Sequence, residues 1–498
     1  MFWSKGESMQ KEIRLLIVLF WGIVLSRVLL MLYLPLMDTT EARYANIALI
    51  MAKTKDWITP YFDYGVPYWG KPPLAFWFQA LSYNIFGVHD FVPRIPSLIV
   101  TLLTAWIIYK VLLQLKDKTT ALWAIIIYFS SLLVYTLSGV VILDTYLTFA
   151  MTLSFTSFIM LLHGYKKYWG YLFFVGLGIG LLAKGPLAII IVGGTIFIWI
   201  LLSFKTRVRS LLLLPWVGGL VLMLAIALPW YILAENKTPG FLHYFIVGEH
   251  FNRFLVSGWK GDLYGTAHHR TKGIVWFMWL YCSLPWGIIG IWFILRNLFD
   301  KVKNKILLNQ LKKDDISFYV IWMLFPMLFF TMAANVTETY LLYGFPALGI
   351  LFAIYYNALD ADSKQKCRKF FLASALFVPL LGVLGALYVK ENAPKLKTEK
   401  FLIQKYHEMA QSNEPIYFLN SKEFSQTYYM NKKIKSISLN ELQHIIGNSA
   451  DKGYFVVVHN GNDDIIKQNF KNFYLLYKSS RYTLFFHPSY LEKKALND

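Results

Sequence analysis

Charged residues are scarce in this sequence. Asp, Glu, Lys and Arg make up only 16% of the 498 residues, whereas soluble domains contain roughly 25%. Hydrophobic residues reach 56% and aromatic residues 18%. Aromatic side chains with a polar tip suit membrane interfaces. This balance excludes an ordinary soluble domain and indicates a polytopic membrane protein.

Cysteine is nearly absent as well. Cys282 lies in an apolar run and Cys367 in a basic loop, so we expect neither a disulfide nor a metal framework. The sequence also lacks a P-loop, a GxGxxG turn after a strand, and HExxH or GxSxG in a usable context. A nucleotide-driven enzyme is therefore unsupported, and the donor of an enzymatic reaction would arrive already activated, through the lipid.

The formal net charge of +20 could suggest a nucleic-acid partner. However, the Lys and Arg residues cluster in short loops between long apolar runs, which is the positive-inside pattern of membrane proteins. We therefore expect no nucleic acid among the partners.

The apolar runs predict the transmembrane organisation. At ~20 apolar residues per crossing, we count about eleven spans: 13–34, 94–114, 120–138, 145–163, 169–184, 186–204, 211–234, 273–295, 317–334, 340–359 and 370–390. The first run is too long for a cleaved signal sequence, so we interpret it as a retained signal anchor.

Basic residues predict the orientation. They lie at the N-terminus and in the even-numbered connections: Lys116 and Lys118; Lys166 and Lys167; Lys205, Arg207 and Arg209; Arg296 through Lys313; and Lys364 through Lys369. These connections should be cytoplasmic. The odd-numbered connections, 35–93, 139–144, 235–272 and 335–339, and the chain after 391 should then face outward.

Two outward regions have structure of their own. In the first loop, residues 41–54 and 71–86 have the pattern of amphipathic helices that lie along a surface. After residue 393 the apolar runs shorten, and 415–419, 454–458 and 482–486 have the pattern of strands, with helices near 398–411 and 440–447. We predict an all-α polytopic bundle of about 11–13 transmembrane helices over 1–392 and a small soluble α/β domain over 393–498.

The residues that could take part in a reaction all lie in the connections that we expect to face outward. Asp38, Glu41 and Arg43 follow the first span. A carboxylate can act as a general base, bind a metal or orient an acceptor, and the planar fork of Arg suits a phosphate. The same residues also fit a capped helix start with a local ion pair.

Further candidates stand in three short motifs. Lys71, in YWGKPP, precedes a Pro pair and would be well positioned to capture a phosphate, although a lysine that snorkels to the interface gives the same pattern. Asp144, at the outer end of the fourth span, could be catalytic or only a helix cap. His250 and Arg253, in EHFNRF, precede His268, His269 and Arg270. Their spacing matches no trusted metal motif, and the His-His-Arg run also fits a solvated loop.

Lys184 and Tyr340 lie at outward span ends. Packing or anchoring explains either residue alone. A cluster of acids and bases at one face of a membrane bundle nevertheless suggests a reaction site there, because charge in or beside a bilayer is costly.

Taken in order, these motifs resemble the C-type superfamily of membrane glycosyltransferases. The resemblance is to the branch that contains the aminoarabinose transferases of lipid A and the bacterial relatives of protein O-mannosyltransferases. It is carried by the first-loop block 38–98, which includes DTTEARY and YWGKPP, and by 142–148, 182–186, 249–253 and 339–342. It covers about residues 10–360.

The resemblance implies transfer of a sugar from a polyprenyl-phosphate carrier at the outer face of the cytoplasmic membrane, with inversion. The acceptor would be an envelope lipid such as lipid A, a glycan or a protein. By position, the resemblance implies catalytic Asp144 with Asp38 or Glu41, donor-phosphate binding by Arg43, Lys71, Tyr68, Arg253 and Tyr340, and a pocket that also contains Tyr44, Lys184 and His250.

Two departures from the family pattern affect these expectations. Relatives often have Glu before the Lys-Pro pair, where this chain has Gly70, and that Glu is implicated in metal binding. The resemblance therefore allows a divalent metal cofactor, and Gly70 argues against one. Relatives also often have Asp-Glu directly before Arg-Tyr, whereas Thr40 precedes Glu41 here, so the identity of the catalytic acid stays open.

Two other functions remain as alternatives. A transporter or flippase of lipid-linked glycans would tend to show inverted repeats and broken helices near the middle of the bilayer, and no repeat is found in the sequence. A membrane anchor that presents the C-terminal domain would not need the acids and bases of the first loop.

Overall fold

The computed structural model describes residues 2–265, 270–298, 314–410, 414–448, 453–462, 466 and 473–488. His268 and His269, and the basic segment 299–313, lie outside these ranges.

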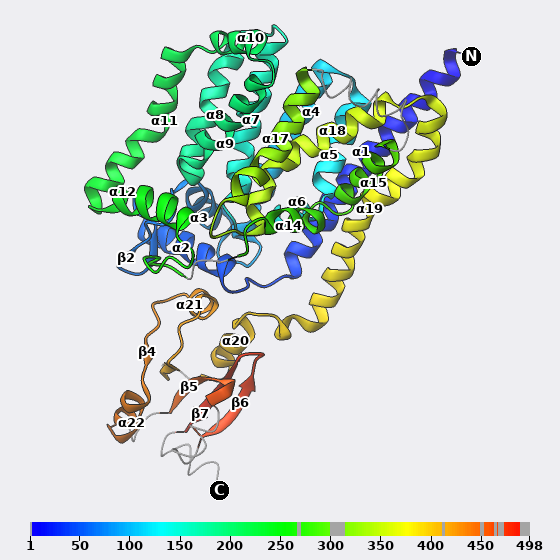
Figure 1. Cartoon of the computed structure of the whole chain (residues 1–498). Helices are drawn as coiled ribbons and strands as arrows, with labels where there is room; N and C mark the ends of the chain where they lie inside the picture. Colours follow the sequence, from blue (N-terminus) through cyan, green and yellow to red (C-terminus); the bar gives the residue numbers. More distant parts are fainter. Residues whose placement is uncertain are drawn as a thin grey trace.

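The described part of residues 2–392 is a bundle of apolar helices (Figure 1). Its long elements are α1 (Phe2–Tyr33), α4 (Ile95–Leu115), α5 (Lys118–Ser130), α7 (Asp144–Leu162), α8 (Tyr168–Lys184), α9 (Leu187–Leu201), α11 (Trp216–Lys237), α14 (Ile274–Cys282), α15 (Trp286–Leu298), α17 (Asp314–Thr331), α18 (Phe345–Ala358) and α19 (Ala361–Asn392). α7 is central and buried almost throughout, with α8, α4 and α9 packed around it. At Gly176 of α8, a methyl group would lie 2.6 Å from the Ala150 carbonyl oxygen of α7, so glycine permits this close approach.

Within the described ranges, six helices are long and apolar enough to cross a membrane, or seven if α14 and α15, which meet at a bend of 105°, form one span. Three more are apolar but shorter: Tyr168–Lys184, Leu187–Leu201 and Asp315–Thr331. Every predicted span overlaps a helix or a pair of helices, and 120–138 corresponds to α5 and α6 (Leu132–Leu137), which are interrupted at Ser131. The multi-pass α-helical fold is confirmed, and the number of crossings stays a prediction.

The two sets of connections gather at opposite ends of the bundle. At the upper end in Figure 1 lie the N-terminus and α10 (Phe204–Arg207). Among the predicted cytoplasmic connections and the ends of their helices, polar contacts join His163 to Asp315 and Asp117 to Asn357. α2 (Thr40–Thr54), α3 (Leu74–Phe86) and α12 (Phe241–His243) lie at the lower end.

The first long loop, 35–93, which is predicted to face outward, forms α2, β1 (Tyr61–Asp63), β2 (Val66–Pro67), α3 and the short helix η1 (Val92–Arg94). α2 is a helix where the sequence predicts one, but it is buried around most of its circumference because α3 and α21 both pack against it. α3 keeps an exposed apolar face that includes Phe78, Leu81 and Ile85, as expected for a helix at a membrane interface.

Two arginines are fully buried where this loop meets the bundle. Arg94 holds Glu41 through its Nε and Nη2, at 2.7 and 2.8 Å. Arg27, near the C-terminal end of α1, donates from Nη2 to the carbonyl oxygen of Thr136 at 2.7 Å. A methyl group at Gly139 would come within 2.7 Å of the Arg27 guanidinium, so the chain after α6 closes tightly over it.

The C-terminal part is a small α/β unit at the lower end of the bundle (Figure 1). Its sheet has the order β4-β3-β5-β7-β6, formed by β3 (Ile416–Leu419), β4 (Ser436–Ile437), β5 (Tyr454–His459), β6 (Tyr474–Lys478) and β7 (Tyr482–His487). β3 runs parallel to β4 and β5, and β7 runs antiparallel to β5 and β6. α20 (Lys400–Met409), α21 (Phe424–Met430) and α22 (Leu439–Asn448) accompany the strands, so the predicted α/β fold is confirmed.

Candidate active site

The first polar cluster forms where α7 begins and α8 ends. The Nζ atom of Lys184 lies 2.5 Å from Oδ1 of Asp144, and the Tyr343 hydroxyl donates to the same oxygen at 2.5 Å. The Lys184 ammonium also lies 4.5 Å from the centre of the Tyr340 ring. α8 ends after Lys184 because Gly185 has a φ of +79°, which other residues rarely adopt. All of these side chains are largely enclosed by protein, so the ion pair is shielded from water.

A second cluster centres on Glu249, in the π-helical segment Tyr244–Asn252. Its carboxylate lies 2.6 Å from the Lys71 Nζ and 3.1 Å from the Arg253 Nη1. Asp262 lies 3.5 Å from Arg253 on the other side. Burial alone would raise the pKa of Glu249, but Lys71 and Arg253 outweigh it and the pKa is lowered, so Glu249 carries its charge.

His250 connects the two clusters. Its Nδ1 is 2.7 Å from the Phe245 carbonyl oxygen and its Nε2 is 3.2 Å from the Lys184 carbonyl oxygen. Burial lowers the pKa of His250, although both carbonyls oppose this effect. The ring therefore fixes the end of α8 against the segment that carries Glu249.

Tyr44 of α2 is influenced electrostatically by several of these cations. Burial alone would raise the pKa of its phenol, but Arg43, Lys71 and Lys184 together outweigh burial and lower the pKa. Tyr44 also contributes to the raised pKa of the Arg253 guanidinium. His250 joins the two clusters, and Arg43 lies 5.1 Å from the centre of the Tyr44 ring, so the two clusters form one site.

The Arg43 guanidinium is held by aromatic rings. It lies 5.1 Å from the centre of the Tyr44 ring and 5.7 Å from that of Phe424, and its Nη1 donates to the Tyr264 carbonyl oxygen at 2.8 Å. Its buried Nε has no hydrogen-bond partner among the described residues. Tyr68 is buried beside Tyr44, with ring centres 6.4 Å apart. A buried donor without an acceptor suggests that a ligand supplies one.

The two first-loop acids are engaged elsewhere. Glu41 is clamped by Arg94 and also accepts from the backbone N–H of Val141 at 3.3 Å, so it ties the loop to the 139–144 connection. Asp38 pairs with Arg481 of the C-terminal unit at 2.6 Å and accepts from Ser425. Of the three predicted catalytic acids, only Asp144 lies among the cations of the candidate site.

Sequence reasoning gave no role to three members of the site: Glu249, Tyr343 and Phe424. Glu249 precedes Arg253 by four residues, the spacing at which side chains meet on a helix, and this could have drawn attention to it. Tyr343 follows Tyr340 by one turn of the helix η4 (Glu338–Gly344). Nothing in the sequence indicated Phe424, because it approaches from the other domain.

The residues at this site do not fit a divalent metal. Among the described residues, no group of three His, Cys, Asp or Glu side chains has an arrangement that could hold a metal ion. Where relatives carry Glu, a side chain at Gly70 would start 3.0 Å from the Tyr68 ring. The reaction proposed below therefore contains no step through a metal.

Comparisons with known proteins agree with the resemblance. A family model described as dolichyl-phosphate-mannose-protein mannosyltransferase matches residues 11–245. The undecaprenyl phosphate-alpha-4-amino-4-deoxy-L-arabinose arabinosyl transferase of Aeromonas hydrophila is 30% identical over 343 residues, which are 68% of this chain and 58% of that protein. The protein of the same name from Yersinia enterocolitica is 28% identical over 360 residues, which are 70% and 60%. The chain thus spans about three-fifths of the length of these relatives.

The fold matches solved structures over nearly its whole length. ArnT from Cupriavidus metallidurans bound to undecaprenyl phosphate aligns with a TM-score of 0.77 at 15% identity, covering 95% of this chain and 98% of that one. The same protein in the apo state gives 0.74 at 16% identity, covering 94% and 97%. At this identity the likeness shows the fold. Together with the family match, it confirms the resemblance stated from the sequence.

Proposed function

We propose that the chain is a glycosyltransferase. The proposal proceeds from its fold and its ordered motifs, which are those of the C-type membrane glycosyltransferases in the branch of the aminoarabinose and protein mannosyl transferases. Its donor is a sugar linked to a polyprenyl phosphate, and its acceptor is an envelope lipid such as lipid A, a glycan or a protein. The reaction takes place at the outer face of the cytoplasmic membrane. The curated relatives carry names of arabinosyl transferases that use undecaprenyl phosphate, which favours this donor class.

The observation that carries the proposal is a group of cations held in place by protein contacts. Lys184 pairs with Asp144, Lys71 and Arg253 both pair with Glu249, and Arg43 lies against the Tyr44 ring. When the acceptor attacks the anomeric carbon, the bond from that carbon to the phosphate oxygen breaks and its electron pair stays on the phosphate. Cations held in place by protein contacts stabilise this developing charge without having to reorganise.

Asp144 is the proposed general base. Lys184 and Tyr343 both donate hydrogen bonds to its Oδ1, which fixes the orientation of the carboxylate. It can take the proton of an acceptor hydroxyl as the oxygen attacks. Attack from the face opposite the leaving phosphate inverts the sugar. Asp38 and Glu41 act in this scheme as positioning residues for the first loop.

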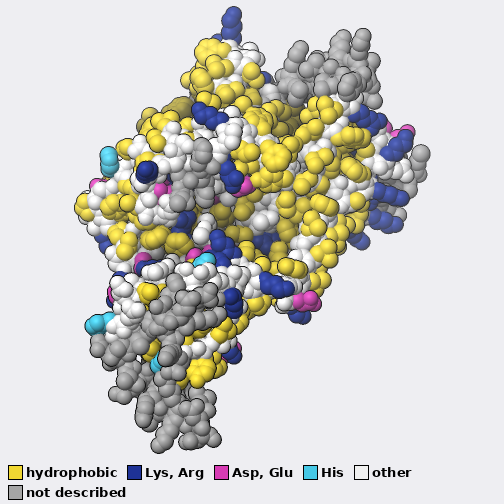
Figure 2. Space-filling model, turned by 60° about the horizontal axis from the view of Figure 1, so that its bottom comes forward, with side chains coloured by type: hydrophobic (Ala, Val, Ile, Leu, Met, Phe, Trp, Pro, Cys, Tyr) yellow, Lys and Arg dark blue, Asp and Glu magenta, His cyan; other side chains and the backbone are white. Residues whose placement is uncertain are grey.

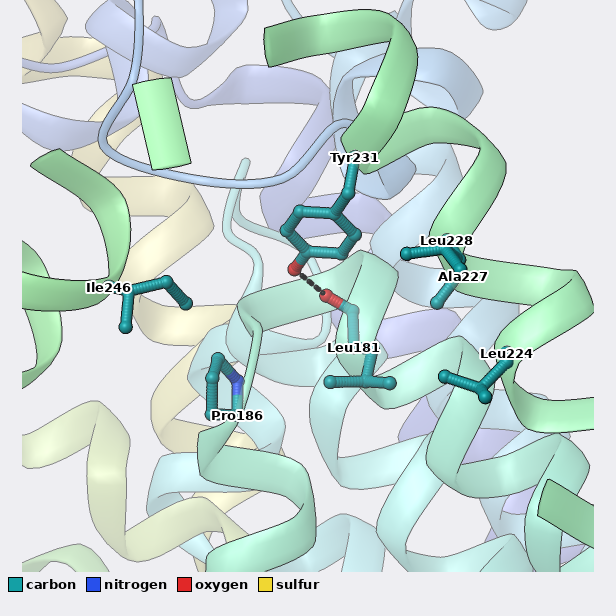
Figure 3. Close-up of a pocket in the computed structure, with 7 residues that line it drawn as sticks. All are labelled: Leu181, Pro186, Leu224, Ala227, Leu228, Tyr231 and Ile246. Carbon is teal, nitrogen blue, oxygen red and sulfur yellow. Dashed lines mark hydrogen bonds between the residues drawn. The ribbon is translucent and has the colours of Figure 1, made fainter. Parts of the chain in front are cut away.

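An apolar cavity of about 130 Å³ lies beside the end of α8 and supports a lipid-linked donor (Figure 3). It is lined by Leu181, Pro186, Leu224, Ala227, Leu228, Tyr231 and Ile246. Leu181 and Pro186 flank Lys184 in the sequence, so a prenyl chain in this cavity would bring its phosphate towards the cations. α11, which lines the cavity, also exposes Val217, Val221 and Leu228 along its length, which suits contact with lipid.

Reconstitution in vesicles with an undecaprenyl-phosphate sugar and a panel of acceptors tests the proposal. We expect transfer, with loss of activity in Asp144→Asn and Lys71→Ala while both variants remain folded. A product that keeps the donor's anomeric configuration would refute the inversion. Movement of lipid-linked sugar across the bilayer without transfer would favour the alternative of a flippase.

A further inference from the structure

Glu249 occupies the two cations that the proposed function assigns to the donor phosphate. Its Oε2 is 2.6 Å from the Lys71 Nζ and 3.1 Å from the Arg253 Nη1, and the Tyr244 hydroxyl donates to Oε1 at 3.3 Å. Its side chain is only 3% exposed. One carboxylate therefore satisfies the donors that a phosphate would need.

Lys71 and Arg253 each have a second contact besides Glu249. Arg253 also has Asp262 at 3.5 Å and a buried Nε without a hydrogen-bond partner among the described residues. Lys71 additionally donates to the Gly70 carbonyl oxygen at 2.5 Å. If the carboxylate moved aside, Arg253 would keep Asp262 as a partner. At Lys71 the incoming phosphate would take the place of Glu249, which avoids the costly outcome of an isolated buried charge.

The backbone around Glu249 is unusual as well. The segment Tyr244–Asn252 is π-helical, and such segments appear mostly at functional sites. His250 anchors the neighbouring residue to Phe245 and Lys184. This anchor fixes the backbone next to Glu249, so an exchange of partners would involve the Glu249 side chain.

We infer that Glu249 is an intramolecular competitor of the lipid phosphate and promotes release of the polyprenyl-phosphate product. This inference rests on the proposed function. The donor is a phosphodiester with one negative charge, and the product is a phosphomonoester that carries up to two. Lys71 and Arg253 would bind the product phosphate more tightly than the donor phosphate. When the Glu249 carboxylate returns to these two cations, it competes with the product and offsets the difference in affinity.

Equilibrium binding of undecaprenyl phosphate to the full-length protein in detergent is the direct test. We expect Glu249→Gln to bind this product about tenfold more tightly, since a neutral amide competes poorly for two cations. Its first turnover should be fast and its later turnovers slow. Glu408→Gln is the matched control, because it makes the same change in an exposed ion pair with Lys405 on α20, and it should leave both quantities unchanged.

Equal or weaker product binding by Glu249→Gln would overturn the inference and make Glu249 an orienting group for Lys71 and Arg253. Glu249→Asp covers the case in which the amide variant fails to fold. Its shorter side chain keeps the charge but cannot reach both cations, so it should also tighten binding. An unaltered protein that neither binds undecaprenyl phosphate nor transfers sugar would instead refute the proposed function.

Discussion

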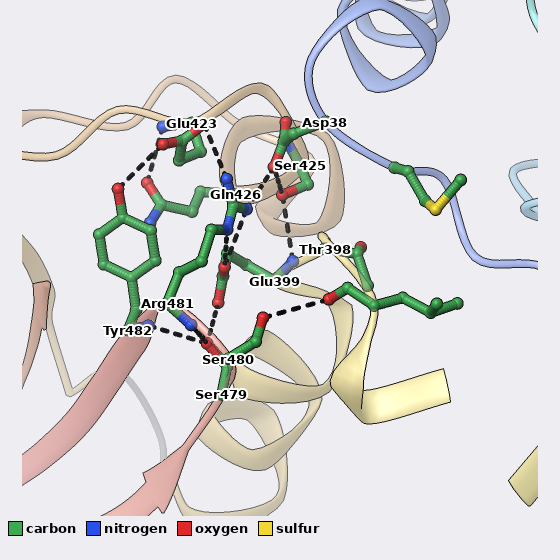
Figure 4. A network of polar contacts seen from close by, with 12 residues as sticks. Asp38, Thr398, Glu399, Glu423, Ser425, Gln426, Ser479, Ser480, Arg481 and Tyr482 are labelled. Atoms are coloured by element: carbon green, nitrogen blue, oxygen red, sulfur yellow. Dashed lines mark hydrogen bonds and ion pairs between the residues drawn. The ribbon is translucent and has the colours of Figure 1, made fainter. Parts of the chain in front are cut away.

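Asp38 and Arg481 form an ion pair of 2.6 Å although 443 positions separate them in the sequence. The pair joins the first outward loop to the last hairpin of the C-terminal unit (Figure 4). The same guanidinium reaches Glu399 at 2.9 Å and Glu423 at 3.3 Å. The space-filling view shows charged side chains gathered between the apolar bundle and the C-terminal unit (Figure 2).

The docking of the C-terminal unit also brings α21 into contact with the candidate active site. α21 contacts Asp38 through Ser425 and, one residue earlier, contacts the Arg43 guanidinium through Phe424. The C-terminal unit therefore contributes a wall to the site as well as covering the loop.

Arg481→Met should destabilise the docked C-terminal unit strongly. Asp38 and Glu399 are fully buried, and removal of their shared cation leaves both without compensation, at a cost of about 3–5 kcal/mol. Thermal unfolding and limited proteolysis of the purified protein would measure this. Lys435→Met removes an exposed ion pair of 3.7 Å and should change stability little; equal effects of the two substitutions would contradict the prediction.

Glu399 should make stability depend on pH. Burial raises the pKa of Glu399 from 4.5 to about 7, with Asp38 acting in the same direction and Ser479 and Arg481 opposing. The folded protein then binds this proton more tightly than the unfolded chain does. Its contribution is complete below pH 4.5 and is lost as the pH rises through about 7, by at most about 3 kcal/mol.

Melting temperatures measured across this range would check the effect, with Glu399→Gln as the comparison because an amide does not titrate. We expect a flatter pH profile for the variant. Parallel profiles for the two proteins would show that another group is responsible.

Asp144→Asn should reduce the rate of transfer to a hydroxyl acceptor by roughly a hundredfold to ten-thousandfold, the usual contribution of a general base. Binding of undecaprenyl phosphate should persist because the cations remain. Asp38→Asn should instead lower stability, since its contacts are structural. Single-turnover kinetics and thermal unfolding of both variants would distinguish these roles, and a larger kinetic loss in Asp38→Asn would reverse the assignment.

Phe424→Ala should raise the KM for the lipid-linked donor about tenfold through loss of the cation–π contact that orients Arg43. The turnover number should change less, since Phe424 does not touch the reacting atoms in the proposal. Phe401→Ala is the control: it removes a ring that lies 5.8 Å from Lys400, away from the site. A donor KM unaffected by either substitution would show that Arg43 needs no support from the C-terminal unit.

The sequence predicted most of the bundle, because long apolar runs form helices wherever they occur. Short apolar runs also indicated the strands near 454–458 and 482–486, and the structure has β5 and β7 at these positions. The edge strands β4 and β6 were not predicted, since β4 is only two residues long and β6 has exposed Tyr474 and Leu475. Such segments have little periodic pattern to detect.

The candidate site was predictable in its members but not in its pairings. Lys71, Asp144, Lys184 and Arg253 were all singled out as outward polar residues, and the structure brings them together. Which acid pairs with which base depends on tertiary contacts across distant residues, such as Lys184 with Asp144. The position of Asp38 against Arg481 could not be foreseen, because it depends on how the C-terminal unit docks.

The burial of Arg27 in α1 has a consequence for biogenesis. Its hydrogen-bond acceptor, the Thr136 carbonyl, is synthesised 109 residues later, and an arginine without a partner inside an apolar span is costly in a hydrocarbon environment. We therefore expect the first helix to reach its final position only after α6, which contains Thr136, has been synthesised. The first helix to be synthesised would then be among the last to pack into its final position.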